Sequence, residues 1–475
     1  LEVQRTTKYS NYNFEDIEPR LFRLKGNVIK EANMLNKSDE YWASVRQVPL
    51  TKKESNMDVF MNRIEQIPGF KYVIFGAKAL IENFVETGTK KHPSKFDFGP
   101  INTIITSNYV NGTRFRLSGM TTGNLDPHWS FSGYAAYGTR DGRFKGGGSL
   151  EVAFNRQLTR ELTLSGRHDV LQLGAGENAL TESNILSSIL SRGDTRLSMV
   201  DEGDLAYEHE WHHGVTAFLG TRLRRIHANR YVPMRYPDGR PAGSVADASV
   251  RVGLRFAKDE TVYRQPFDKQ SLGSKYPITT LFFTAGIPEI LDRSSRYCRI
   301  EGSLRYRPEL PPLGYSDLTL QGGHISGRVP YLLLKLHEGN GTYFYDPYAF
   351  SCMDYYEFAS DTWFAWFYEH HFNGILLGRL PLFKRLKWRE VAICKGVWGT
   401  LSERNNGARP GSGAPLLFPP GMSSVSTPYV EAGFGIENIL RICRVDFIWR
   451  LTHRDPQPGE RIQRFAVNLG VQLKF

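Results

Sequence analysis

The sequence closes with eleven residues in which apolar and polar side chains alternate, Phe465-Ala466-Val467-Asn468-Leu469-Gly470-Val471-Gln472-Leu473-Lys474-Phe475. A β-strand points successive side chains to opposite faces, so one face of this segment is apolar and the other polar. Roughly ten such residues cross a bilayer in a transmembrane barrel, with lipid on one side and water or protein on the other. The segment therefore predicts a membrane-spanning strand with an outward face of Phe465, Val467, Leu469, Val471, Leu473 and Phe475.

The same two-residue period recurs from Phe98 onward. Val250, Val252, Leu254 and Phe256 alternate with Ser249, Arg251, Gly253 and Arg255. An inward face this rich in charge does not form a dry core, so a wet or ion-paired lumen is expected. About 380 residues, at roughly 22 to 25 per strand with its connection, give about sixteen strands. The predicted fold is all-β: a transmembrane antiparallel barrel over residues 96–475.

Composition excludes other classes. The chain has 475 residues, and no apolar run approaches the roughly 18 residues of a membrane helix. Sixty Lys and Arg against 49 Asp and Glu give a net charge of +11. Because no RNA-binding signature or basic helix accompanies this charge, we expect a basic lumen and loops near anionic lipid, and no nucleic-acid partner.

Residues 1–95 differ from the remainder. Thr51-Lys52-Lys53-Glu54 is a capping box, and Met57, Phe60 and Ile64 follow it at helical spacing. A second candidate helix runs over residues 70–85. We expect a periplasmic helical segment that covers a barrel mouth, with a plug or a linker to a docking module as the alternatives. The start at Leu1 is expected to lie downstream of a cleaved or otherwise missing segment.

Two sets of motifs resemble known barrel families. The first set consists of Gly327-Arg328-Val329-Pro330, a long loop to about Asp361, Trp363 to Phe372, Val391 to Trp398, Val430 to Glu437 and Arg464 to Phe475. This set resembles the surface-antigen superfamily, which contains BamA, TamA and the two-partner secretion transporters. Tyr355 to Asp361, Tyr368 to Gly374 and Tyr41-Trp42 are similar to an uncharacterised Bacteroidota barrel family, often preceded by a carboxypeptidase-regulatory-like domain.

The resemblance implies a sixteen-stranded barrel whose first and last strands meet at a weak seam. In such relatives the seam opens so that a client strand adds to the exposed edge or a substrate crosses. Here the first strand is expected over residues 101–107, with Ile101, Thr103 and Ile105 on it, and the last over residues 465–475.

The resemblance also implies a lumenal loop between about Arg328 and Ser360. Relatives carry an Arg-Gly-aromatic motif there that pairs with an acidic strand residue, whereas this loop has Tyr345-Asp346-Pro347-Tyr348. Glu369 either lacks its partner or pairs with another lumenal Arg. The expected network of loop and lumen comprises Tyr345, Asp346, Glu357, Asp361, Glu369, His371, Arg444 and Asp446.

Three further motifs look chemical. His209-Glu210-Trp211-His212-His213 fits the HExxH zinc pattern, but its flanks predict a strand, where residues four apart lie about 13 Å from one another. Glu369-His370-His371 lacks a nucleophile elbow, so lumenal pairing is favoured over catalysis, with His370 facing outward. Gly146-Gly147-Gly148 has no following Lys and suits close backbone approach. The four cysteines have no metal spacing and are expected as free thiols.

The favoured hypothesis is an outer-membrane barrel without a chemical step, a cofactor or a metal, which assembles or translocates proteins through its seam. The alternative is a structural or channel barrel that scaffolds surface lipoproteins through its outer loops. An outer-membrane hydrolase comes last. Expected partners are outer-membrane lipids and lipopolysaccharide, together with lipoproteins or outer-membrane proteins.

Overall fold

The computed structural model describes residues 28–29, 41, 44, 72, 76, 82–89, 92–155, 158–174, 188, 191–192, 196–265, 267–291, 294–408, 411, 413–455 and 462–471. The predicted helices of the first 95 residues lie almost entirely outside these ranges. Two outward residues predicted for the last strand, Leu473 and Phe475, lie outside them as well. In the described part of the chain, no helix is both long and apolar enough to cross a membrane.

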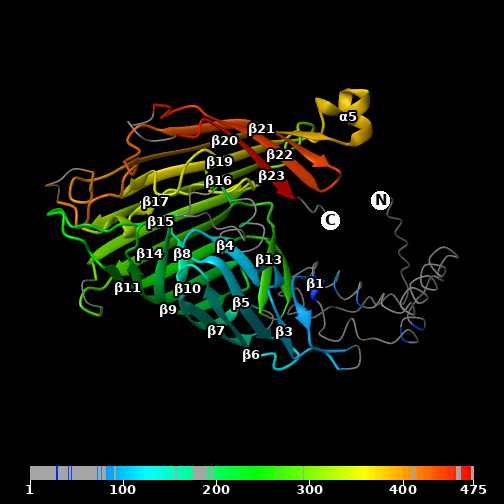
Figure 1. Ribbon diagram of the computed structural model, residues 1–475. Coiled ribbons are helices and arrows are strands. Elements are labelled where there is room, and N and C mark those ends of the chain that lie inside the picture. The colour runs from blue at the N-terminus through cyan, green and yellow to red at the C-terminus, as the bar shows by residue number, and fades with distance from the viewer. Residues whose placement is uncertain are drawn as a thin grey trace.

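One antiparallel sheet curls into a barrel, as predicted (Figure 1). Its wall begins with a first strand in two pieces, β3 (Phe96–Phe98) and β4 (Ile105–Asn108). Fifteen more strands follow, each paired with the next: β5 (Gly112–Thr121), β6 (Trp129–Gly138), β7 (Phe144–Asn155), β8 (Arg160–Gln172), β9 (Leu197–Glu210), β10 (Val215–His227), β11 (Ser244–Ala257), β14 (Ile278–Gly286), β15 (Tyr297–Tyr306), β16 (Tyr315–Gly327), β19 (Thr362–His371), β20 (Arg389–Thr400), β21 (Tyr429–Ile439), β22 (Cys443–Arg450) and β23 (Phe465–Val471). With β3 and β4 counted as one, the described wall has the expected sixteen strands.

The first strand corrects the prediction for residues 101–107. Ile101 and Thr103 lie in a single 3-10 turn, η3 (Ile101–Thr103), and of the three predicted residues only Ile105 lies in a strand. Both β3 and β4 pair with β5, but Phe98 pairs with Gly119 and Ile105 with Phe115, so the strand carries three extra residues. Pro100 precedes the turn and has no amide hydrogen to donate to a ladder, which is a local reason for the break.

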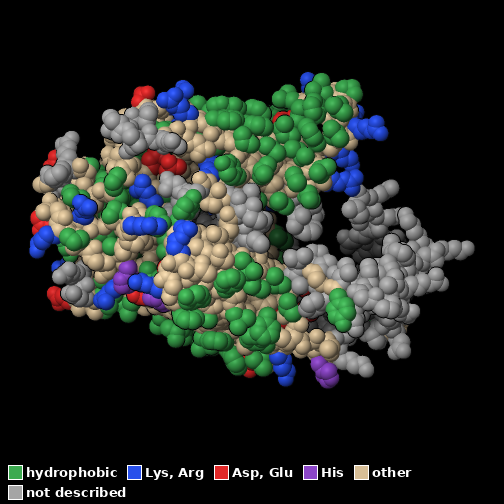
Figure 2. Space-filling model, viewed as in Figure 1, with side chains coloured by type: hydrophobic (Ala, Val, Ile, Leu, Met, Phe, Trp, Pro, Cys, Tyr) green, Lys and Arg blue, Asp and Glu red, His purple; other side chains and the backbone are tan. Residues whose placement is uncertain are grey.

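Large apolar side chains on the outer face are exposed along every barrel strand from β4 to β11. Phe115, Phe131, Leu164 and Leu219 are all about half exposed, while the intervening polar residues of β5, Arg114 and Ser118, are buried. β23 follows the predicted alternation in full over its described residues, exposed at Phe465, Val467, Leu469 and Val471 and buried at Ala466, Asn468 and Gly470. Figure 2 shows hydrophobic side chains over the wall.

The two rims of the barrel differ. β23 ends and β3 begins at one of them, here called the terminus rim; the opposite one is the loop rim. Long connections at the loop rim span residues 173–196, 328–361 and 401–428. Short turns at the terminus rim span residues 211–214 and 440–442. Two connections at this rim are longer: residues 258–277 form β12 (Thr261–Gln265) and β13 (Asp268–Gly273), and residues 372–388 contain η6 (Leu377–Arg379) and α5 (Pro381–Leu386).

Two short strands tie the N-terminal part of the chain to this rim. β1 (Val28–Ile29) pairs in parallel with β12, and β2 (Val85–Glu86) pairs with β3. Val85 is therefore in a strand, at the end of the range predicted as a second helix. β2 thus pairs with the edge of β3 that faces away from β5.

Candidate functional site

The connection between β16 and β19, residues 328–361, folds into the barrel and is called the lumenal loop. It contains η5 (Tyr331–Leu333) and the two-residue strands β17 (Lys335–Leu336) and β18 (Ala359–Ser360). Tyr331 and Leu332 to Leu334 are buried against inward residues of the wall such as Val200, Ile226 and Ile325. The lumen near the loop rim thus contains an apolar core, which the expectation of a wet or ion-paired lumen did not include. The loop supplies the apolar surface that the wall alone lacks.

Two buried charges from the wall hold the middle of the lumenal loop. Glu431 of β21 accepts hydrogen bonds from the amides of Ser351, at 2.8 Å, and Cys352, at 2.7 Å. Lys395 of β20 donates to the carbonyls of Asp346, at 2.6 Å, and Ala349, at 2.9 Å. Charged groups without partners would be very unfavourable at this depth, so these bonds fix the position of the loop. Sequence reasoning missed both residues; charged positions on inward strand faces were the available signal.

Glu369 of β19 is the centre of a buried cluster. Its Oε2 accepts a bond from Arg444 Nη1 at 2.7 Å, and its Oε1 accepts the Tyr345 hydroxyl. Arg444 Nε also donates to Asp446 Oδ1 at 2.8 Å, and its guanidinium lies 4.3 Å from the Tyr345 ring centroid. Of the two alternatives, the second is correct: Glu369 pairs with a lumenal arginine from β22, while the loop contributes a tyrosine.

The remaining predicted network residues fall into separate groups. Glu357 accepts a bond from Arg450 Nη2 at 2.6 Å. Asp361 accepts bonds from Ser402 and Asn405 at the loop rim. His371 Nδ1 lies 3.0 Å from Glu437 Oε2, and its Nε2 lies 3.5 Å from Glu369. Asp346 enters the arrangement through its backbone carbonyl. The loop therefore contacts the wall at several separate positions.

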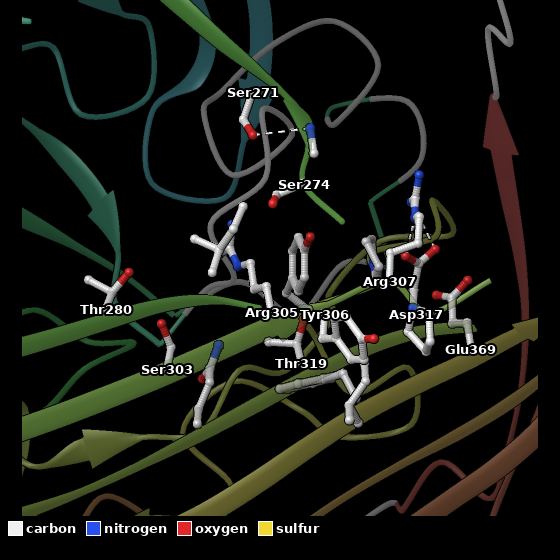
Figure 3. Close-up of a pocket in the computed structure, with 18 of the residues that line it drawn as sticks. Ser271, Ser274, Thr280, Ser303, Arg305, Tyr306, Arg307, Asp317, Thr319 and Glu369 are labelled. Atoms are coloured by element: carbon white, nitrogen blue, oxygen red, sulfur yellow. Dashed lines mark hydrogen bonds and ion pairs between the residues drawn. The ribbon is translucent and has the colours of Figure 1, made fainter. Parts of the chain in front are cut away.

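Below the lumenal loop lies a cavity of about 1930 Å³. Figure 3 shows Arg305 and Tyr306 of β15, and Arg307 directly after it, beside Asp317 and Thr319 of β16, with Glu369 at one side. Arg307 Nη2 donates to Asp317 Oδ2 at 2.9 Å, and Arg305 lies over the Tyr348 ring at 4.7 Å. Phe344, Gly470 and Val471 also line the cavity, so it extends to the last strand.

The barrel closes at a seam between β23 and the first strand. Among the described residues, no ladder joins these two strands directly, since the pairings run from β3 and β4 round to β23. Instead, the lumenal loop lies along β23. The Leu469 amide donates to the Tyr343 carbonyl at 2.8 Å and the Tyr345 amide donates to the Leu469 carbonyl at 2.7 Å, with Phe344 bridging Leu469 in parallel. Asn468 Nδ2 adds a bond to the Phe344 carbonyl at 3.2 Å.

A second inserted segment connects this loop to the opposite edge. Ser191, from the connection between β8 and β9, bridges Thr342, and the Arg192 amide donates to the Gly341 carbonyl at 2.8 Å. Three residues earlier, Ser188 Oγ accepts the Ser107 amide of β4 at 2.9 Å. The gap between β4 and β23 is thus bridged by two segments, one from the connection between β8 and β9 and one from the lumenal loop.

The HExxH residues lie at a strand end, as the flanks predict. β9 ends at Glu210, whose carboxylate pairs with Arg264 at 2.8 Å and Lys269 at 3.1 Å. The His209 ring packs on the Trp211 ring, and the described residues contain no group of three or more His, Cys, Asp or Glu that could hold a metal ion. His370 alternates with Glu369 and His371 on β19, as expected for an outward residue, but it is buried, with its ring nitrogens 2.8 Å from Ser316 Oγ and 3.0 Å from the Leu313 carbonyl.

Two smaller predictions also have outcomes. An added Cβ at Gly147 would lie 2.8 Å from the Tyr134 ring, consistent with the close approach expected for the glycine run. All four cysteines are free thiols; Cys352 is buried in the lumenal loop, where burial raises the pKa of its thiol.

Comparison with known proteins gives a family match over part of the chain. The model described as "Family of unknown function (DUF5686) C-terminal domain" matches residues 233–403, from just before β11 to just after β20 and including the lumenal loop. No curated protein matches.

Several solved barrels are similar in structure. BamA from Haemophilus ducreyi lacking POTRA domains 1–3 has a TM-score of 0.48 and 9% identity, covering 81% of this chain and 70% of that one. Pseudomonas aeruginosa OccK11 (OpdR) has a TM-score of 0.29 and 11% identity over 75% of this chain and 87% of that one. OccK3 (OpdO) of the same organism has a TM-score of 0.30 and 9% identity over 79% and 92%.

Proposed function

We propose that this chain is an outer-membrane β-barrel that assembles or translocates polypeptides through its lateral seam. The membrane placement is supported by the exposed apolar side chains that alternate with buried polar ones around the wall, from Phe115 to Val471. Such a surface is unfavourable in water and suits hydrocarbon. In this placement the terminus rim faces the periplasm and the loop rim the cell exterior, where lipopolysaccharide lies.

The observation that carries the proposal is the bridging of the seam. The edge of β23 is occupied at Leu469 by a loop segment held through two backbone hydrogen bonds. Strand alternation points the amides of Val467 and Val471 to the same edge, away from β22. Among the described residues, neither amide has a backbone acceptor there. An edge of this kind accepts an added strand once the segment leaves. A client strand would take the place of residues 343–345.

The lumen disfavours a simple channel. The lumenal loop packs into an apolar core with Val200, Ile226 and Val245, and the buried charges Lys395 and Glu431 fix its middle. A solute crossing from rim to rim would have to displace this loop. Movement of a polypeptide into the wall requires only that the segment beside Leu469 and its Ser191–Arg192 neighbour leave the seam.

A disulfide between Phe344→Cys and Leu469→Cys tests the proposal, with Cys298, Cys394 and Cys443 replaced. Directly paired residues in a sheet lie within the Cα separation that a disulfide spans. In proteoliposomes, the oxidised variant should fail to insert an unfolded barrel polypeptide, scored by heat-modifiable gel mobility, and reduction should restore insertion. Phe344→Cys alone is the control. Full insertion by the oxidised variant would reject the seam mechanism.

Photo-cross-linking distinguishes the scaffold alternative. A cross-linker at Val467 or Val471 should capture the client, whereas one at Phe434, equally outward on β21, should not. A scaffold for lipoproteins would instead retain its partners through the loop rim, with or without the locked seam.

A further inference from the structure

The connection between β19 and β20 at the terminus rim carries an exposed apolar and basic protrusion. Leu376, Leu380, Leu382 and Leu386 are 59%, 50%, 63% and 45% exposed. Residues 372–389 contain five basic residues, Arg379, Lys384, Arg385, Lys387 and Arg389, and no Asp or Glu. Figure 2 shows hydrophobic side chains covering this protrusion around α5, with Lys and Arg at its margin. Neither the lumenal loop nor the seam accounts for it.

The protrusion is a fixed element. The Glu390 carboxylate accepts the amides of Leu376, at 2.7 Å, and Leu377, at 3.2 Å. Asn438 Nδ2 of β21 donates to the Lys387 carbonyl at 2.6 Å, and the Phe383 and Trp388 rings pack 5.4 Å apart. α5 begins at Pro381 and ends before Lys387, whose left-handed conformation turns the chain back toward β20. The exposed leucines are therefore held out from the barrel by bonds at both ends of the connection.

The apolar surface is continuous with the lipid-facing wall. The neighbouring turn between β21 and β22 exposes Leu440, at 82%, and Ile442, at 46%, beside the Asn438 contact. Beyond this turn the outer faces of β21 and β22 present Phe434 and Trp449. In Figure 1, α5 projects outward from the wall near the ends of β20 and β21.

We infer that residues 374–389 form an interfacial anchor that binds anionic phospholipid in the leaflet at the terminus rim, an inference that rests on the membrane placement proposed above but not on the seam. Short amphipathic segments with basic margins lie in the headgroup region, leucines toward the acyl chains and Lys or Arg toward phosphates. Each basic residue near an anionic surface adds to the attraction. The one carboxylate that contacts the segment in these bonds, Glu390, is engaged by the Leu376 and Leu377 amides. The anchor fixes the depth and tilt of the wall next to β20 to β23, four strands that end at the seam.

Hydrogen exchange of peptide 374–389 in the full chain tests the inference. The barrel is placed in nanodiscs of phosphatidylcholine alone or with phosphatidylglycerol added. Exchange should be roughly tenfold slower in the anionic bilayer. Lys384→Gln/Lys387→Gln should abolish this difference, whereas Leu382→Ser/Leu386→Ser should speed exchange in both bilayers.

The matched control is Lys258→Gln/Lys275→Gln, which removes the same charge from another connection at the same rim and should preserve the tenfold difference. Equal exchange of the native protein in the two bilayers would overturn the inference, as would an unchanged difference in Lys384→Gln/Lys387→Gln. Protection that appears only when membrane proteins are added would identify a protein partner and also overturn it. Because seam function is not measured, this result is independent of client insertion.

Discussion

A proline at Leu469 tests whether the lumenal loop is held on the seam by main-chain pairing. The Leu469 amide donates to the Tyr343 carbonyl and not to β22, so Leu469→Pro removes a seam hydrogen bond while the β22 ladder stays intact. Val467→Pro is the matched control. Its amide points to the same edge by strand alternation but, among the described residues, has no such acceptor.

The expected size of the effect follows from the bond that is lost. A net contribution of about 0.5 to 1.5 kcal/mol for one backbone hydrogen bond corresponds to a roughly two- to thirteenfold increase in the released population. In the native chain the Tyr343 carbonyl oxygen lies 2.8 Å from the Leu469 nitrogen. The proline ring replaces the amide hydrogen and would crowd this oxygen, so we expect an increase near the upper end of this range. Strain from the fixed φ of proline is shared by both variants.

Hydrogen exchange of residues 340–347 measures the release, because the Tyr345 amide is protected by the Leu469 carbonyl. Leu469→Pro should speed exchange of this peptide by the stated factor, and Val467→Pro should leave it near the native rate. Identical rates in the two variants would refute the reasoning, since strain in β23, rather than the seam bond, would then govern the loop.

Three further predictions concern the lumen and the HExxH site. Glu369→Ala leaves Arg444 with Asp446 as its remaining carboxylate partner and should lower the free energy of unfolding in urea by about 3 to 5 kcal/mol. Tyr345→Phe removes only the hydroxyl bond to Glu369 and should lower it by no more than about 1.5 to 3 kcal/mol. Equal losses in the two variants would contradict the central role of Glu369. Burial, with Lys335 nearby, lowers the pKa of His337 to about 3. Below about pH 6.5 the unfolded loop binds a proton that the folded loop does not, so the stability of the loop should fall by about 1.4 kcal/mol per pH unit from pH 6.5 to pH 3. In hydrogen exchange of the loop, His337→Gln should remove most of this pH dependence. Added zinc should leave the thermal unfolding midpoint unchanged, because Glu210 is engaged by Arg264 and Lys269; a rise that His209→Ala removes would show a metal site.

Local pattern was sufficient for the wall. A period of two identifies a strand wherever one face meets lipid, because any shift of one residue would exchange the two faces. The strand around Val250 to Phe256 in β11 and the outward residues Phe465, Val467, Leu469 and Val471 follow directly from it. The first strand, which the resemblance placed over residues 101–107, was placed incorrectly because Pro100 and three extra residues divide it.

The contacts inside the lumen could not be predicted from sequence periodicity. Glu369 and Arg444 are 75 residues apart and meet only when the wall closes, and neither carries a local signal for the other. The resemblance supplied the acidic residue and a loop, but placed the arginine on the loop. Here the arginine lies on β22, and the loop brings a hydroxyl. Long connections such as residues 328–361 are where sequence periodicity ends, and their position depends on the surface that the strands leave uncovered.

One residue joins the two parts of the site. Tyr345 donates its amide to Leu469 on the seam and its hydroxyl to Glu369 in the buried cluster. Arg444, which holds Glu369, is also the ladder partner of Gly470, the residue after Leu469. In the proposed mechanism, a client strand that displaces residues 343–345 would therefore separate Tyr345 from Glu369, whereas the bond between Glu369 and Arg444 could persist within the wall. Because that charge pair would stay satisfied, the proposed opening would cost the hydrogen bonds of the loop and not the exposure of an unpaired charge.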